Sequence, residues 1–168
     1  MTVRAPPSGD HHPGPLAARL VVGPFFLSDR SRFVRLVYNV RSMPKLKILL
    51  VEDDGFLASI YAQKLELEGF EVSLATNGED GLRLATKDKP ALILLDLLMP
   101  KMDGFEVLEK LKEEKSLKDI PVLVLTNLGQ REDVERCMKM GAIGYIIKAH
   151  SLPNETVKRV KEILHVAV

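Results

Sequence analysis

Two apolar runs of the sequence end in carboxylates. Glu52 and Asp53 directly follow KILLV, and Asp96 directly follows ALILL. An unpaired carboxylate is costly to bury, and three carboxylates that share one site cannot all stay ionised unless a cation joins them. Hard oxygen ligands with room for water suit Mg²⁺ or Mn²⁺. If the folded chain brings these three residues together, we expect them to bind such an ion.

A hydroxyl group and an ammonium group end two further apolar runs, at Thr126 after VLVL and at Lys148 after GYII. Together with a divalent cation, these two groups would surround a dianion attached to Asp96 and neutralise its oxygens, as sites of phosphoryl transfer do. A carboxylate that attacks a phosphoryl group forms an acyl phosphate. Asp96 is therefore interpreted as a nucleophile.

A regular alternation of strands and helices is expected to position these side chains. The predicted strands are 46–51, 70–75, 91–95, 120–126 and 142–148, and the predicted helices are 55–69, 77–89, 103–115, 131–141 and 153–165. Asn77 is expected to cap the second helix, and Asp103 with Glu106 has the spacing of a capping box. Asp54 fits either an N-cap of the first helix or a metal ligand, and the cap is the preferred interpretation.

Five strand and helix pairs in alternation predict an α/β fold, with a doubly wound five-stranded parallel sheet and helices on both of its faces. In such sheets, ligands bind beyond the carboxyl ends of the strands, where the strand order reverses. If the order is 2-1-3-4-5, the first and third strands are neighbours at that point. Glu52, Asp53 and Asp96 are then brought together.

The segments KILLVEDD, LILLDLLMPKMDG, VLVLT and GAIGYIIK resemble, in order and spacing, the receiver (CheY-like) domain of bacterial two-component response regulators. The likeness covers residues 45 to about 165 and implies the flavodoxin-like receiver fold. It also implies that Asp96 accepts phosphate from a histidine kinase or a histidine phosphotransfer protein. Glu52, Asp53, Asp96 and the main-chain carbonyl of Leu98 would hold the Mg²⁺ (or Mn²⁺) cofactor.

The same resemblance implies that Thr126 is the switch hydroxyl, Tyr145 the switch aromatic residue and Lys148 the phosphate-binding lysine. Two positions depart from the family pattern. Most receivers follow this lysine with a proline in a cis peptide, whereas this chain has Ala149, and a cis bond before a residue other than proline costs about 3 kcal/mol. The peptide is therefore expected to be either trans or strained. The residue after Thr126 is usually very small, but here it is Asn127.

The expected function is that of a single-domain response regulator, because only three residues follow the last predicted helix. Its output would leave through the surface formed by the fourth helix, fifth strand and fifth helix, where a downstream protein would bind, with no direct contact to nucleic acid. The chain is expected to perform no enzymatic reaction beyond its own phosphorylation and autodephosphorylation.

Three other functions were weighed against this one. A haloacid dehalogenase-like phosphatase needs a second aspartate two positions after its nucleophile, where this chain has Leu98. A flavodoxin-type flavin binder needs a hydroxyl-bearing and glycine-rich loop after the first strand, where this chain has EDDGF. A receiver-like scaffold that is never phosphorylated is the third alternative, and Ala149 and Asn127 motivate it.

Residues 1–43 differ in composition from the rest and are predicted to be a disordered, Arg/Pro-rich extension, while residues 44–168 are the predicted receiver domain. Residues 1–42 contain six arginines and no lysine and carry +4, so the remainder carries −3. The preferred explanation is translation from an upstream start, with Met43 as the natural initiator. A targeting or nucleic-acid-binding arm is the alternative.

Composition limits the setting in which the protein works. Cys137 is the single cysteine, so no intramolecular disulfide can form, which agrees with a cytoplasmic location. No stretch reaches the roughly 18 uninterrupted apolar residues of a membrane span. No membrane partner is therefore expected.

Overall fold

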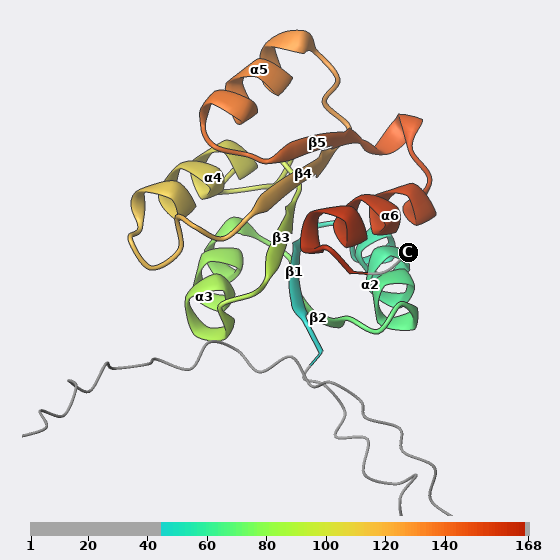
Figure 1. The fold of residues 1–168 in the computed structure, drawn as a ribbon. Helices are drawn as coiled ribbons and strands as arrows, with labels where there is room; N and C mark the ends of the chain where they lie inside the picture. Colours follow the sequence, from blue (N-terminus) through green and yellow to red (C-terminus); the bar gives the residue numbers. More distant parts are fainter. Residues whose placement is uncertain (1–44, 167–168) are drawn as a thin grey trace, which may run out of the picture. The chain divides into compact units, whose positions relative to one another are not determined.

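The computed structural model describes residues 45–166, which form a parallel sheet flanked by helices (Figure 1). The strands are β1 (Lys47–Val51), β2 (Glu71–Ala75), β3 (Leu92–Leu95), β4 (Val122–Thr126) and β5 (Gly144–Ile147). The helices are α2 (Gly55–Leu67), α3 (Gly78–Asp88), α4 (Gly104–Glu113), α5 (Arg131–Lys139) and α6 (Pro153–Leu164), with a 3₁₀ turn η1 (Lys148–His150). The predicted extension, residues 1–43, lies outside the described residues.

The strand order is β2-β1-β3-β4-β5, and every neighbouring pair is parallel. The predicted fold class and strand order are therefore confirmed. Helices α2 and α6 cover one face of the sheet, while α3, α4 and α5 cover the other (Figure 1). Each face has its own apolar core, because successive side chains of a strand point to opposite faces.

The central strands are apolar because both of their faces are covered. Every residue of β3 and of β4 is buried. Strand β2 at one edge and strand β5 at the other are only partly buried. Full burial of one leucine or isoleucine side chain stabilises the fold by about 2 kcal/mol, so the three inner strands form a firm support for the residues that follow them.

Capping residues start three of the helices shortly after the strand ends, as the sequence predicted. The Asp54 carboxylate accepts the Phe56 and Leu57 N–H groups, so Asp54 is the N-cap of α2. Asn77 caps α3 by accepting the N–H of Asp80 at 2.9 Å.

The predicted capping box of α4 is also present. The Asp103 carboxylate accepts the Glu106 N–H at 2.9 Å, and the Glu106 carboxylate accepts the Asp103 N–H at 3.1 Å. Helix α5, by contrast, begins at Arg131, and the preceding Gln130 makes no side-chain cap hydrogen bond. The start of α4 is therefore fixed more firmly than the start of α5.

Candidate functional site

The carboxylates that follow β1 and β3 meet at the carboxyl edge of the sheet. Val51 pairs with Leu95 in the parallel register, so the next residues, Glu52 and Asp96, are neighbours. Ligand oxygens of Glu52, Asp53 and Asp96 all lie within 4.8 Å of one another. Glu52 and Asp96 are buried, with 1% and 5% of their surface exposed, whereas Asp53 is exposed. The structure therefore brings together the three side chains that the sequence singled out as metal ligands.

The ammonium group of Lys148 lies between the two buried carboxylates. It donates to Asp96 Oδ2 at 2.7 Å and also to Glu52 Oε2. The Lys148 side chain is only 6% exposed, and Lys148 is the first residue of η1, directly after β5. The carboxyl ends of β1, β3 and β5 are thus joined by one buried cation.

Burial and charge oppose each other at this ion pair. Burial raises the pKa of Glu52 above its usual range, although the hydrogen bond from Lys148 works in the opposite direction. Burial alone would lower the pKa of Lys148, but the hydrogen bonds and charges of Asp96 and Glu52 outweigh it and raise that pKa. Lys148 therefore stays protonated and supplies the positive charge that two buried acids require.

The loop from β3 to α4 holds Asp96 by its backbone and by its side chain. The Leu98 N–H donates to Asp96 Oδ1 at 3.1 Å, and the Gly104 N–H donates to the Leu97 carbonyl at 3.0 Å. A Cβ atom at Gly104 would lie 2.1 Å from the Asp96 carbonyl oxygen, so only glycine fits at the start of α4. The predicted role of the Leu98 carbonyl as a metal ligand stays a prediction.

Thr126 and Tyr145 contact the same residue of the loop after β4. Thr126 is fully buried, and its hydroxyl accepts the Leu128 N–H at 3.4 Å. The Tyr145 hydroxyl donates to the Leu128 carbonyl at 3.2 Å, and burial raises its pKa to about 12. Sequence reasoning named both switch residues and placed Leu128 beside the site, but it did not predict these two hydrogen bonds, because a main-chain partner leaves no signal in residue types.

The two departures from the receiver pattern also have a place in the structure. No described residue has a cis peptide bond, so the trans alternative for Ala149 is the one observed. Residues Lys148–His150 form η1, a turn that the sequence analysis did not predict. Asn127 is exposed on the loop between β4 and α5.

The donor set suits a hard divalent cation. Two buried carboxylates and one exposed carboxylate supply oxygen atoms within the span of a single ion, and the one ammonium group of Lys148 balances only part of their formal charge. Mg²⁺ prefers a few carboxylate ligands and retains several waters, which the exposed Asp53 side allows. The residues present therefore fit the ion that the sequence predicted.

Taken together, a 2-1-3-4-5 sheet with an acidic cluster, a threonine and a lysine at its carboxyl edge is the arrangement of a receiver domain. The chain belongs to this family: the sequence profile of the response regulator receiver domain matches residues 48–161. Receiver domains are phosphoacceptor domains of two-component signalling and bind Mg²⁺ at an acidic pocket.

Curated relatives agree with this assignment. The chain is 38% identical over 120 residues to "Probable transcriptional regulator ycf27" of Porphyra purpurea, and the match covers 71% of this chain and 48% of that protein. It is also 38% identical over 118 residues to "DNA-binding dual master transcriptional regulator RpaA" of a Synechocystis strain, and that match covers 70% of this chain and 48% of that protein. The chain thus spans about half the length of the curated relatives it matches.

A solved structure supports the fold. The chemotaxis protein CheY4 of Vibrio cholerae superposes with a TM-score of 0.67 at 28% identity, over 71% of this chain and 98% of that chain. Among the described residues, no helix has the length and apolar character needed to span a membrane.

Proposed function

We propose that Asp96 receives a phosphoryl group from a phosphorylated histidine kinase or histidine phosphotransfer protein. The observation that supports this most directly is the pairing of a buried Asp96 with Glu52 and Lys148 at the carboxyl edge of the sheet. In the transfer, an Asp96 carboxylate oxygen attacks phosphorus, the N–P bond breaks, and the imidazole leaves with a proton. The products are an acyl phosphate and a neutral histidine.

Each side chain of the site has a proposed task in this transfer. The Lys148 ammonium, now 2.7 Å from Asp96 Oδ2, would bind phosphoryl oxygens, and the Thr126 hydroxyl would donate to another. Glu52, Asp53, Asp96 and the Leu98 carbonyl are the proposed ligands of Mg²⁺ (or Mn²⁺), which supplies positive charge to the phosphoryl oxygens when bound. No further catalysis is proposed beyond this self-phosphotransfer and autodephosphorylation.

The proposed switch works through Leu128. When the Thr126 hydroxyl binds a phosphoryl oxygen, its hydrogen bond from the Leu128 N–H breaks. The hydrogen bond from the Tyr145 hydroxyl to the Leu128 carbonyl then breaks as well, and the Tyr145 ring turns inward. A population change from 1:99 to 99:1 needs about 5.5 kcal/mol of differential stabilisation. A new dianion beside Lys148 is a source of that size, because charge-assisted hydrogen bonds in a buried site are strong.

The proposed output surface is formed by α5, β5 and α6. Exposed apolar side chains lie there, with Met138 on α5 and Ile143 before β5. We propose that a downstream protein binds this surface, and that the receiver itself contacts neither nucleic acid nor membrane. DNA binding is named for RpaA, of which the match covers 48%. A stand-alone receiver in the cytoplasm is the proposed setting.

Labelling with acetyl phosphate tests the proposal. With Mg²⁺ present, we expect stoichiometric labelling that peptide mass spectrometry assigns to Asp96. Asp96→Asn should abolish labelling and keep the far-ultraviolet circular dichroism of the wild type. Asp119→Asn, at an exposed position before β4, is the control and should label normally. Absence of labelling in the wild type would instead support the unphosphorylated scaffold.

A further inference from the structure

Helix α5 is attached to the rest of the domain by few buried groups. Cys137 is its one buried residue among nine, and the other eight are half-buried or exposed. A helix of this length gains most of its stability from packing of an apolar face. The position of α5 therefore depends strongly on the few contacts that it makes.

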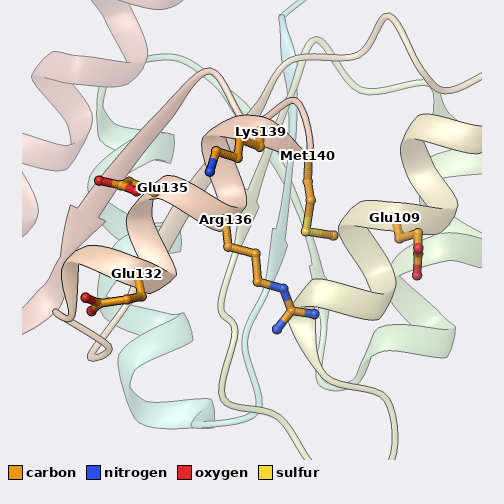
Figure 2. Close-up of a pocket in the computed structure, with 6 residues that line it drawn as sticks. All are labelled: Glu109, Glu132, Glu135, Arg136, Lys139 and Met140. Atoms are coloured by element: carbon orange, nitrogen blue, oxygen red, sulfur yellow. The ribbon is translucent and has the colours of Figure 1, made fainter.

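One of these contacts crosses from α5 to α4. The Arg136 guanidinium carbon lies 4.0 Å from the centre of the Phe105 ring, which is a cation–π distance. Figure 2 shows Arg136 reaching from α5 toward α4. A hollow of about 530 Å³ separates the two helices and is lined by Glu109, Glu132, Glu135, Arg136, Lys139 and Met140. Arg136 is thus a bridge across an open gap.

The Phe105 end of this bridge belongs to the site of phosphorylation. Phe105 is 8% exposed and follows Gly104, where an added Cβ would lie 2.1 Å from the Asp96 carbonyl oxygen. A close backbone contact therefore links the start of α4, and with it Phe105, to the loop that carries Asp96. Arg136, on the other end, moves with the helix that forms part of the output surface.

We propose that the Arg136–Phe105 contact holds α5 in the arrangement in which Lys148 is bonded to both carboxylates and Tyr145 is bonded to Leu128. Arg136 is in this role a positioning residue, and loss of its contact favours the alternative arrangement of α5. The inference rests on the proposed function, because that alternative arrangement is the one produced by a phosphoryl group on Asp96. Coupling of this kind is reciprocal, so a weaker contact at α5 strengthens binding at Asp96.

Beryllofluoride, a phosphoryl mimic, provides the binding test at fixed Mg²⁺, with the titration followed by NMR. Arg136→Gln should bind beryllofluoride about threefold more tightly than the wild type, in keeping with the strength of an exposed cation–π pair. Phe105→Leu should have the same effect, and Arg136→Lys, which keeps a cation over the ring, should restore wild-type affinity. Lys139→Gln removes the same charge from the same helix and hollow and should leave the affinity unchanged.

A second measurement does not depend on phosphorylation. Amide hydrogen exchange across α5 should be about threefold faster in Arg136→Gln than in Lys139→Gln, while exchange in α4 stays the same. Unchanged α5 exchange, or an unchanged or weaker beryllofluoride affinity in Arg136→Gln, would overturn the proposed role of Arg136. Failure of the wild type to bind beryllofluoride would overturn the proposed function, and faster α5 exchange would then still establish the Arg136 contact itself.

Discussion

Helices α4 and α5 cover the same face of the sheet but are attached to it in different ways. Helix α4 buries five residues, begins with a capping box and packs its first glycine against the Asp96 carbonyl. Helix α5 buries one residue and begins without a side-chain cap. The difference fits the proposed function: the loop of a phosphoacceptor has to keep a fixed geometry, whereas the helix of an output surface has to be able to move.

Substitutions beside Asp96 are therefore expected to cost more stability than the loss of the single buried group of α5. Lys148 and Gly104 test the first part of this contrast and Cys137 tests the second, in order of decreasing expected effect.

Loss of the buried ion pairs of Lys148 beside Asp96 is the first test. Lys148→Met leaves Glu52 and Asp96 buried without their cation, so the free energy of unfolding should fall by about 3–5 kcal/mol. Mg²⁺ should recover part of that loss, because the ion replaces the missing charge. Urea denaturation with and without Mg²⁺ measures both effects.

The control for this variant is Lys47→Met, which removes a surface ion pair. Lys47 Nζ lies 3.2 Å from Glu71 Oε1, and both side chains are well exposed. Its loss should cost less than about 1 kcal/mol and show no dependence on Mg²⁺. Equal losses in the two variants would contradict the assignment of Lys148 to the site.

The close packing of α4 on the acceptor loop is the second test. Gly104→Ala places a Cβ 2.1 Å from the Asp96 carbonyl oxygen, so stability should fall by about 1–3 kcal/mol and labelling at Asp96 should slow. Gly55→Ala is the matched control, because no atom lies within 4 Å of its added Cβ. The control should be neutral or slightly stabilising, since alanine is the better helix former. Normal labelling of Gly104→Ala would show that the acceptor loop tolerates displacement.

Cys137, the single buried residue of α5, provides the third test. Burial raises the pKa of its thiol to about 11, whereas in the unfolded chain the thiol ionises near its usual pKa of 9.0. The folded state therefore keeps a proton that the unfolded state loses, so stability falls as pH rises from about 9 to about 11. The thiol's share of the loss, about 2 kcal/mol, should separate the wild type from Cys137→Ala in urea denaturation at each pH, whereas the share of Tyr145 above about pH 10 should persist in the variant. An identical pH dependence in the wild type and Cys137→Ala would show that the thiol contributes nothing.

Much of the fold was predictable from local patterns. Apolar runs predicted all five strands, and the caps at Asp54, Asn77 and Asp103 predicted where three helices begin. The site residues were predictable because parallel strands deliver their carboxyl ends to one edge of the sheet. Asp96 was the clearest indication of a site, since a carboxylate next to a buried strand is costly unless a cation or hydrogen-bond donor pairs with it.

Other features depend on contacts between segments that are distant in the sequence, and no local sequence pattern predicts them. The sequence indicated that Lys148 faces Asp96, but its second hydrogen bond, to Glu52, depends on how the ends of β1 and β5 are placed across the sheet. Leu128 serves both switch residues through main-chain atoms, which every residue type possesses. The Arg136–Phe105 contact joins two helices whose separate sequences show only ordinary amphipathic patterns.

The sequence by itself predicted the alternation of strands and helices and the strand-end residues that form the acidic cluster, because hydrophobic periodicity and strand-end chemistry are local properties. Only the tertiary structure decided that Lys148 bonds Glu52 as well as Asp96, where the switch residues are hydrogen-bonded and how firmly each helix is held. Those features are set by the packing of segments far apart in the chain, which residue order does not encode in any local pattern.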